Sequence, residues 1–215
     1  NPDMSSFSGD SAVSAGIGST LYGKRSLLTS MSGDIKRAAF LRLPLVAFYP
    51  KVKNYSIVFF PQNSQEIFDD IIAAYAVSED KKVLLPAIVK TDFVLNNTYE
   101  TVDVLTQKIV ENMIDGLDLE KPDRHIKYRL NQNLEGEAVL QKAMDNAKKL
   151  ISEFSEKYRK KFKRTIPLIE SAQTADAETI IVTYGPASGN ALLAVNELRA
   201  KGEKVGLARI HIYRP

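Results

Sequence analysis

The sequence predicts an α/β fold built around a largely parallel sheet. Apolar, strand-like runs alternate with stretches of helical periodicity over the first half of the chain, and the final segment, Asp176–Pro215, spells out a complete β-α-β unit. The chain has 215 residues, of which 44% are hydrophobic and 26% charged. That length and composition fit one or two globular domains with a proper core.

The first elements are short and apolar. Ser11–Tyr22 is rich in small residues and predicts a tightly packed helix that ends at Gly23. Arg25–Thr29 predicts a short strand, and Leu43–Tyr49 predicts a second strand that Pro50 stops.

A strand, a helix and another strand follow. Tyr55–Phe60 and Lys82–Val89 predict the third and fourth strands, and Gln65–Ser78 predicts a helix between them with Ser64 as its N-cap. Its apolar residues recur at helical spacing on one face: Ile67, Ile71, Ile72 and Tyr75.

The composition of the chain changes in its middle part. Glu137–Phe162 is heavily charged and predicts a long helix that lies along a domain edge and links two domains. One face carries Leu140, Met144, Ala147, Ile151, Phe154 and Tyr158.

The last segment predicts a second α/β unit. Thr179–Thr183 is a β-branched strand, Gly202 suits the left-handed position after a helix, and Val205–Ile212 reads as the next, parallel strand. One such unit cannot bury both faces of its sheet, so the rest of a small domain is missing from the chain or is supplied by a neighbour.

Composition excludes several functions. With no cysteine, the chain has neither a disulfide framework nor thiolates to hold an iron–sulfur cluster. The net charge of +3 is small and spread out, so no nucleic acid partner is expected. No apolar run reaches membrane-spanning length and no signal peptide is evident, so we expect a cytoplasmic protein without a membrane partner.

Several short motifs occur in order along most of the chain, with little support from Asp103 to Lys127. The motifs are Ser11–Gly18 through Gly23 with Arg25, Leu41–Val46, Val83–Val89 followed by Thr98–Val102, Ala177–Tyr184, Gly185-Pro186-Ala187, Gly202–Leu207 and Tyr213-Arg214-Pro215. Together, and in this order, they resemble the alpha subunit of 2-oxoacid:ferredoxin oxidoreductases, the pyruvate type most closely.

The resemblance implies the fold and its division. We expect a thiamine-diphosphate-binding-type parallel sheet domain of the pyrimidine type over residues 1–120. A helical linker over 121–175 and the beginning of a transketolase C-terminal-like α/β domain over 176–215 would follow.

The resemblance also implies a catalytic carboxylate just before the small-residue helix. In the family a glutamate drives the aminopyrimidine of thiamine diphosphate into its imino form by exchanging a proton. An ungapped alignment places Gly9 at the glutamate position and Asp10 one step away. Either Asp10 substitutes for the glutamate, or omitted residues restore it, or Asp10 merely caps the helix.

Two further pairs match loops that meet the cofactor or substrate in the family. Ser30 and Ser32 match a Thr/Ser-rich loop and could face the cofactor or cap a short helix. Lys51 and Lys53 stand where the family uses an arginine for the substrate carboxylate. A lysine attracts a carboxylate but cannot form the planar, bidentate contact of arginine.

Cofactors and partners follow from the same resemblance. Asp115-Gly116 lacks the rest of the Gly-Asp-Gly motif that holds magnesium, and His125 and His211 offer no metal cage. Thiamine diphosphate and Mg2+ are therefore expected to be shared with or held by a partner chain, and this chain alone holds no cofactor or metal. The expected partners are a beta subunit, an iron–sulfur subunit or domain, ferredoxin and coenzyme A, in an obligate complex doubled by symmetry.

Two glycine motifs have structural and functional interpretations. Gly16-Ile17-Gly18 lacks a preceding strand, so it predicts close helix packing rather than a dinucleotide site. Gly185–Gly189 opens a helix after a strand and predicts a plain tight turn, with phosphate binding as the alternative.

The sequence is compatible with three function classes. The chain is a component of a 2-oxoacid:ferredoxin oxidoreductase, a component of another transketolase-type thiamine enzyme, or a non-catalytic scaffold homologue. Several connections are shorter than in relatives, which means either a trimmed homologue or a sequence that omits loops.

Overall fold

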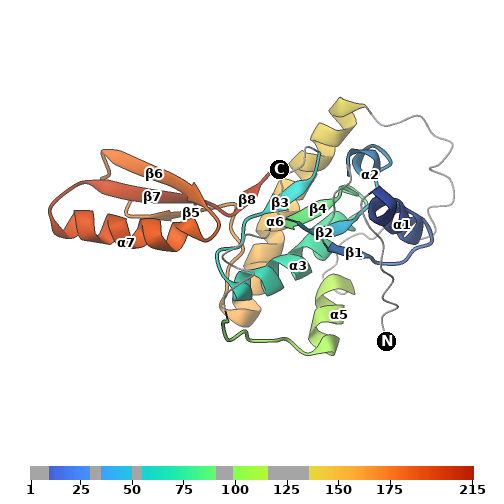
Figure 1. Cartoon of the computed structure of the whole chain (residues 1–215), viewed down its shortest axis with the longest axis horizontal. Helices are drawn as coiled ribbons and strands as arrows, with labels where there is room; N and C mark the ends of the chain where they lie inside the picture. The colour runs from blue at the N-terminus through green and yellow to red at the C-terminus, as the bar shows by residue number, and fades with distance from the viewer. Residues whose placement is uncertain (1–9, 30–34, 50–54, 91–98, 116–135) are drawn as a thin grey trace.

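The computed structural model describes residues 10–29, 35–49, 55–90, 99–115 and 136–215. They form a large lobe and a small lobe joined side by side (Figure 1). The helices are α1 (Asp10–Leu21), α2 (Lys36–Phe40), α3 (Ser64–Ser78), α5 (Gln107–Asp115), α6 (Glu137–Phe162) and α7 (Ala187–Ala200). The strands are β1 (Leu27–Thr29), β2 (Val46–Tyr49), β3 (Ile57–Phe59), β4 (Ala87–Lys90), β5 (Ile169–Ala172), β6 (Thr179–Tyr184), β7 (Val205–Ile210) and β8 (Ile212–Tyr213).

The large lobe contains a five-stranded sheet in the order β1-β2-β4-β3-β8. Its first four strands are parallel, and β8 joins β3 in the antiparallel sense. Val46 lies opposite both Leu27 and Ala87, and Ala87 also lies opposite Ile57, so the strands start in step. The predicted α/β class with a largely parallel sheet is confirmed.

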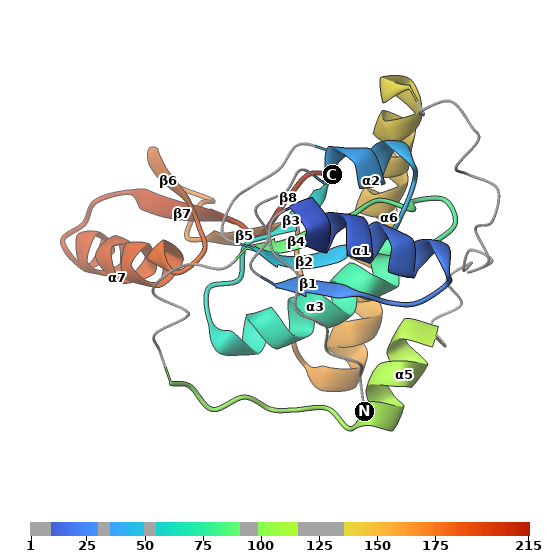
Figure 2. The ribbon, with the colours of Figure 1, turned by 45° about the vertical axis from the view of Figure 1, so that its right-hand side comes forward.

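Helices cover both faces of this sheet, giving three layers (Figure 2). One face packs Val46, Ile57 and Val89 against α3, α5 and α6, and the other packs residues such as Ala47 and Ile88 against α1 and α2. Successive strand residues point to opposite faces, so both faces are apolar and buried.

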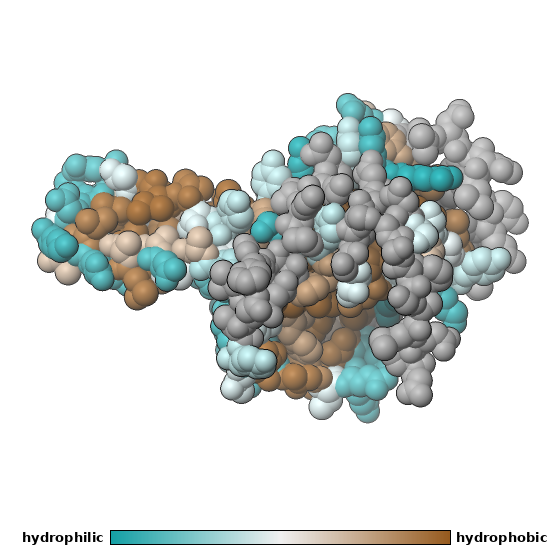
Figure 3. All heavy atoms as spheres, viewed as in Figure 1, coloured by the Kyte–Doolittle hydropathy of each residue, from teal (hydrophilic) through white to brown (hydrophobic). Residues whose placement is uncertain are grey.

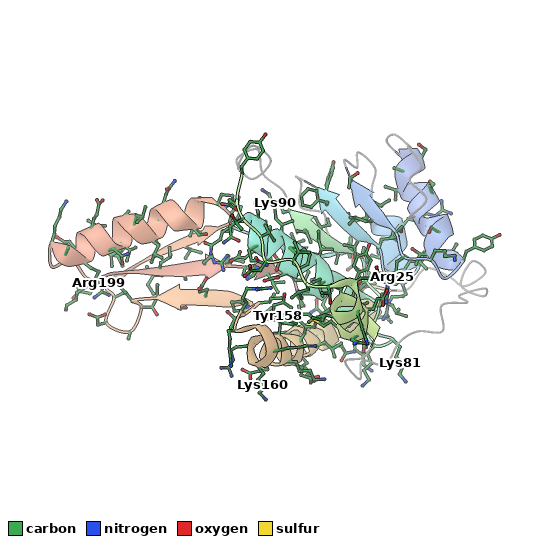
Figure 4. The ribbon with its side chains drawn as sticks, turned by 90° about the horizontal axis from the view of Figure 1, so that it is seen from below. Arg25, Lys81, Lys90, Tyr158, Lys160 and Arg199 are labelled. Atoms are coloured by element: carbon green, nitrogen blue, oxygen red, sulfur yellow. The ribbon has the colours of Figure 1, made fainter. Side chains whose placement is uncertain are left out.

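The long helix α6 is part of the core of the large lobe. Its buried residues match the predicted apolar face and include Ala143 in addition: Leu140, Ala143, Met144, Ala147, Ile151, Phe154 and Tyr158. They pack in the same cluster as the sheet and α3. Tyr158 lies on the side of α6 that faces the lobe, whereas Lys160 lies on the outer side (Figure 4).

The small lobe is the predicted β-α-β unit with one additional strand. Its sheet has the order β5-β7-β6, and β6 and β7 are parallel, as the crossover requires. Gly202 has a φ of +88°, the left-handed value predicted after the helix. Ile180, Val182 and Tyr184 are exposed on alternate positions of β6, and apolar surface spreads across the lobe (Figure 3). The expectation that one face of this sheet stays uncovered is confirmed.

Two predicted strands differ from those observed. The prediction of a strand over Lys82–Val89 is wrong in its first half, because the guanidinium of Arg42 takes the carbonyls of Val83 (2.6 Å) and Leu84 (3.4 Å). Those carbonyls are thereby removed from strand pairing, and β4 starts at Ala87. The predicted strand over Val205–Ile212 is two strands in different sheets, because the chain crosses from the small to the large sheet at His211.

Local details also differ. The N-cap of α3 is Asn63, whose side chain accepts a hydrogen bond from the backbone N–H of Glu66 at 2.8 Å, and Ser64 is already helical. The short helices α2 and α5 were not predicted. Within the described residues, no helix has the length and apolar character required to cross a membrane.

Candidate functional site

The carboxyl edge of the large sheet is the natural place for a ligand. The four parallel strands end there at Thr29, Tyr49, Phe59 and Lys90. In open α/β sheets, ligands bind outside the carboxyl ends of the strands, where the connecting loops converge. This edge is our candidate site.

Four predicted site residues follow strands that end at this edge. Ser30 and Ser32 come directly after β1, and Lys51 and Lys53 come directly after β2, all outside the described residues. β1 and β2 are neighbours in the sheet, and their ends at Thr29 and Tyr49 lie at the same edge. Their roles stay predictions.

The fifth predicted residue, Asp10, is the first residue of α1, and its side chain lies outside the described part of the chain. Gly16 packs on Leu28 of β1, where an added Cβ would lie 3.0 Å from Leu28 Cδ2. Because a short turn at Gly23 reverses the chain between α1 and β1, the N-terminal end of α1 points toward the carboxyl edge (Figure 2). The prediction of close helix packing is confirmed for Gly16. For Gly18 it is wrong within the described residues, because a Cβ added there would meet no atom within 4 Å.

The small lobe meets the large lobe at this same edge. The ring of Phe60, just after β3, lies 4.6 Å from that of Tyr184 at the end of β6. Lys90 Nζ lies 6.0 Å from the Phe60 ring centroid and 5.8 Å from that of Tyr184 (Figure 4). Gly185 then turns into α7 with a φ of +61°. Where the lobes touch, the described part of the candidate site therefore has an aromatic wall and the Lys90 ammonium group.

A buried ionic cluster lies beside this contact. His211 Nε2 is 3.0 and 3.1 Å from the two carboxylate oxygens of Asp70, on α3. Arg209 forms ion pairs with Glu66 at 2.8 Å and with Glu170 at 2.7 Å. The cluster thus joins α3 of the large lobe to the small sheet.

The environment shifts the pKa values of these groups. Burial raises the pKa of Asp70 to about 6, although the neighbouring His211 favours the carboxylate. Burial works against a charged His211, but the Asp70 and Glu66 carboxylates outweigh it and raise the histidine pKa. Burial likewise opposes ionisation of Glu66, whose pKa is nevertheless lowered by His211 and Arg209.

No pattern in the sequence indicates this cluster. In the sequence, His211 is a single histidine within a predicted strand. Its partner Asp70 lies 141 residues away in the chain. The only local cue is that Asp70 occurs beside Ile71 and Ile72 on the apolar side of a helix. A pairing over that distance is visible only in the folded chain.

The described residues fit thiamine diphosphate only in part. Within them, no group of three or more histidine or acidic side chains could hold a metal ion, and the acids near the edge are engaged with His211 and Arg209. The described edge offers apolar walls and the Lys90 ammonium, whereas the side chain of Asp10, the acid suggested by the resemblance, lies outside the described residues.

Fold and site together define a class: a parallel α/β sheet domain whose ligand edge is capped by a second α/β lobe. Two family matches name it. Residues 38–172 match "Pyruvate flavodoxin/ferredoxin oxidoreductase, thiamine diP-bdg", and residues 177–215 match "Pyruvate:ferredoxin oxidoreductase core domain II". The chain belongs to the pyruvate flavodoxin/ferredoxin oxidoreductase family, as the motifs predicted.

Curated relatives support this family assignment. The chain is 32% identical to pyruvate synthase subunit PorA of Pyrococcus abyssi over 240 residues, covering 95% of this chain and 61% of that protein. It is 31% identical to PorA of Methanothermobacter thermautotrophicus over 162 residues, with 72% of this chain and 42% of that protein covered. It is 29% identical to ketoisovalerate oxidoreductase subunit VorA of Pyrococcus horikoshii, with 73% and 42% covered.

The alignments also show how this chain differs in length from its relatives. The chain spans about three fifths of the length of the first relatives, 61% for PorA of P. abyssi. That alignment runs over 240 residues, whereas this chain has 215, so at least 25 (240 minus 215) have no counterpart here. The shorter connections expected from the sequence are consistent with this difference.

Proposed function

We propose that this chain is the alpha-type component of a 2-oxoacid:ferredoxin oxidoreductase of the pyruvate type. The reaction is the oxidative decarboxylation of pyruvate or a similar 2-oxoacid to acyl-coenzyme A, carbon dioxide and reduced ferredoxin. The observation that carries the proposal is the succession of the two family matches, in order, on two lobes that meet at the ligand edge. We further propose a cytoplasmic location.

Each candidate residue has a role in this proposal. Thiamine diphosphate, when bound, supplies the nucleophilic carbon. Asp10 exchanges a proton with the aminopyrimidine, Ser30 and Ser32 face the cofactor, and Lys51 and Lys53 attract the substrate carboxylate. The diphosphate and Mg2+ lie on the partner, and iron–sulfur clusters lie on other chains, because this chain has no cysteine.

The partner proposal has structural support on α1. A Cβ added at Gly18 would have no atom of the described chain within 4 Å, and Tyr22 is 84% exposed. The relatives PorA and VorA are named as subunits. We propose that a beta subunit covers this face of α1, in a complex that also contains an iron–sulfur subunit or domain and acts with ferredoxin and coenzyme A.

The division of the chain is proposed as in the sequence: 1–120, 121–175 and 176–215. The packing of α6 refines the middle part, because its buried face shares the core of the large lobe. Helix α6 therefore packs on the first part, whereas β5 pairs with β7 in the small sheet.

The test is reconstitution with the partner subunits. The co-purified complex should reduce a viologen dye only when both the 2-oxoacid and coenzyme A are present, and Asp10→Asn should lower the rate by roughly 100-fold or more. Asp10→Glu should retain activity because it keeps the carboxylate. Asp145→Asn, on the exposed side of α6, is the matched control and should leave the rate unchanged.

One observation favours a second function, a non-catalytic scaffold. Gly9 occupies the position that aligns with the family glutamate. In that case the reconstituted complex assembles normally, and Asp10→Asn and Asp10→Glu both behave like the unaltered chain. An inactive but stoichiometric complex would select this function over the enzymatic one.

A further inference from the structure

The chain passes from the small lobe to the large lobe through one residue. β7 ends at Ile210 in the small sheet, and β8 begins at Ile212 in the large sheet. His211 stands between them. Its N–H donates to Leu168 O (3.1 Å), just before β5 of the small sheet, and its carbonyl accepts from Phe60 N–H (2.7 Å), just after β3 of the large sheet. His211 is therefore the pivot between the lobes.

The side chain of this pivot is buried against the large lobe. His211 is 1% exposed and Asp70 is 0% exposed. Nε2 of His211 meets the Asp70 carboxylate, whereas its Nδ1 has no hydrogen-bond partner within the described residues. The imidazole is thus held across the junction to α3 by the Asp70 carboxylate at 3.0 Å and, at the longer distance of 3.9 Å, by the Glu66 carboxylate.

We propose that the His211–Asp70 pair is a proton-dependent latch, which holds the small lobe in a fixed orientation on the large lobe while His211 is protonated and loosens when the pair loses its proton. The latch concerns the joint between the lobes and does not rest on the proposed function. It sets where Tyr184 and α7 lie relative to the carboxyl edge.

The charges around His211 explain why loss of its proton should loosen the latch. The groups facing His211 are Asp70 and Glu66 from α3 and Arg209 from β7, and Glu170 of β5 pairs with Arg209. With His211 protonated, three carboxylates face two cations. After deprotonation they face one cation, and the fully buried Asp70 carboxylate loses its charged partner, which is costly at low dielectric.

Neighbouring acids and bases do not replace the lost charge. Asp69, next to Asp70 on α3, is occupied by Arg164 at 2.7 Å and by the Tyr158 hydroxyl at 2.6 Å. Asp69 adds negative potential that raises the Asp70 pKa further. The junction therefore depends on the His211 proton.

The pH window follows from the shifts. The folded chain raises the His211 pKa above 6.5, so the stabilisation is fully present below pH 6.5 and is lost as pH rises through the folded value. The raised Asp70 pKa, about 6 against 3.8, acts in the same direction, because the folded state again binds more protons. Below about pH 6, where Asp70 is protonated, the Nε2–H of His211 still donates to the carboxyl group; above that pH the contact is an ion pair, and it is lost when His211 gives up its proton. The latch is therefore closed on the acidic side and opens on the alkaline side.

Lobe orientation can be measured by spin labels. The chain has no native cysteine, so Lys149→Cys on α6 and Lys201→Cys after α7 give one labelled pair across the junction. Electron–electron distances recorded from about pH 5 to about pH 9 should change from a narrow to a broad distribution above pH 6.5. A control pair within the large lobe, Lys24→Cys with Lys149→Cys, should stay narrow throughout.

The titration itself is read by NMR in the unaltered chain. There are two histidines, so His125→Gln assigns both imidazole signals. The His211 pKa should lie above 6.5 and coincide with the midpoint of the distance change. His211→Gln should give a broad distribution at every pH, and Asp70→Asn should shift the His211 titration to lower pH.

Two results would overturn the latch. Either His211 titrates at or below pH 6.5, or the distance across the junction stays narrow through the whole of its titration. Both measurements use the unaltered pair, so they decide the question even if the His211 or Asp70 variant fails to fold.

Discussion

Gly16 and Gly18 are two residues apart on α1 yet have different surroundings. A Cβ at Gly16 would meet Leu28 of β1, whereas a Cβ at Gly18 would meet nothing within 4 Å in the described chain. The first glycine serves the internal contact of helix and strand. The second faces outward, where we propose the partner chain.

The two positions give a matched pair of variants. Gly16→Leu should destabilise the isolated chain by about 1 to 3 kcal/mol through overpacking against Leu28, measured by thermal or urea unfolding. Gly18→Leu should leave its stability unchanged or raise it by up to about 1 kcal/mol, because leucine favours helix over glycine.

In co-purification with the beta subunit, we expect Gly18→Leu to have a larger effect than Gly16→Leu. Gly18→Leu should block co-purification with the beta subunit by overpacking the interface. Recovery of the Gly18→Leu complex at normal yield and activity would contradict the placement of the interface on α1.

A second residue-scale contact fixes α6 to α3. Asp69, 3% exposed, accepts from the Tyr158 hydroxyl and pairs with Arg164. Burial and the hydrogen bond to Asp69 raise the Tyr158 pKa, and the same carboxylate raises that of Arg164. The three groups satisfy one another in a place with little water.

Removing the cation should therefore be costly. Arg164→Met should lower the free energy of unfolding by about 3 kcal/mol, because the buried Asp69 loses its charged partner. Arg159→Met removes an ion pair with Glu156 in which both side chains are more than half exposed, and it should cost less than about 1 kcal/mol. If urea unfolding showed that both variants lose the same free energy of unfolding, the ion pair with Arg164 would not be what stabilises the buried Asp69.

At the scale of elements, the start of α3 shows how the local signal misassigned a cap. The sequence favoured Ser64, but the extended backbone of Asn63 lets its side chain accept the Glu66 N–H. Glu66 itself reaches back to the Gln62 N–H at 2.9 Å. The two contacts satisfy free donors at the start of the helix.

The two cap assignments predict different mutational effects. Asn63→Ala should destabilise the chain by about 1 kcal/mol, the usual cost of losing an N-cap. Ser64→Ala should cost less than about 0.5 kcal/mol, since it is a surface substitution within the helix. A larger loss for Ser64→Ala in the same unfolding assay would restore the cap to Ser64.

The extent of β4 depends on another element. Arg42 follows α2 and reaches the carbonyls that precede β4. The apolar run from Val83 onward looks like a strand because it is buried, yet Leu84 has a φ of +44°. Burial and β-pairing are different properties, and a short apolar run does not separate them.

At the scale of the whole molecule, the part of the candidate site that the structure describes contains no group of three or more histidine or acidic side chains that could hold a metal ion. We expect the isolated chain to bind thiamine diphosphate weakly and to turn over no 2-oxoacid, because in the proposed complex the partner holds the diphosphate and Mg2+. Calorimetry with the cofactor and Mg2+ tests this. A complex of roughly micromolar affinity or tighter without a partner would contradict the shared site.

The sequence was most informative where periodicity and turn chemistry are strong. The α/β class, the buried face of α6, the β-α-β unit and the turn at Gly202 are visible in local patterns and are confirmed. Of the candidate site, the sequence supplied Asp10, Ser30, Ser32, Lys51 and Lys53 by resemblance, and their roles remain predictions. The aromatic wall of Phe60 and Tyr184 could not be predicted, because it joins residues from separate lobes.

The sequence by itself determined which segments fold as strands and helices and to which family they belong, because hydrophobic spacing, glycine turns and motif order are properties of neighbouring residues. Only the tertiary structure decided where the last strand divides, since His211 lies between two sheets. It also decided that Asp70 is buried against His211, and that the second lobe caps the ligand edge. Those outcomes depend on contacts across the chain, for which no local pattern exists.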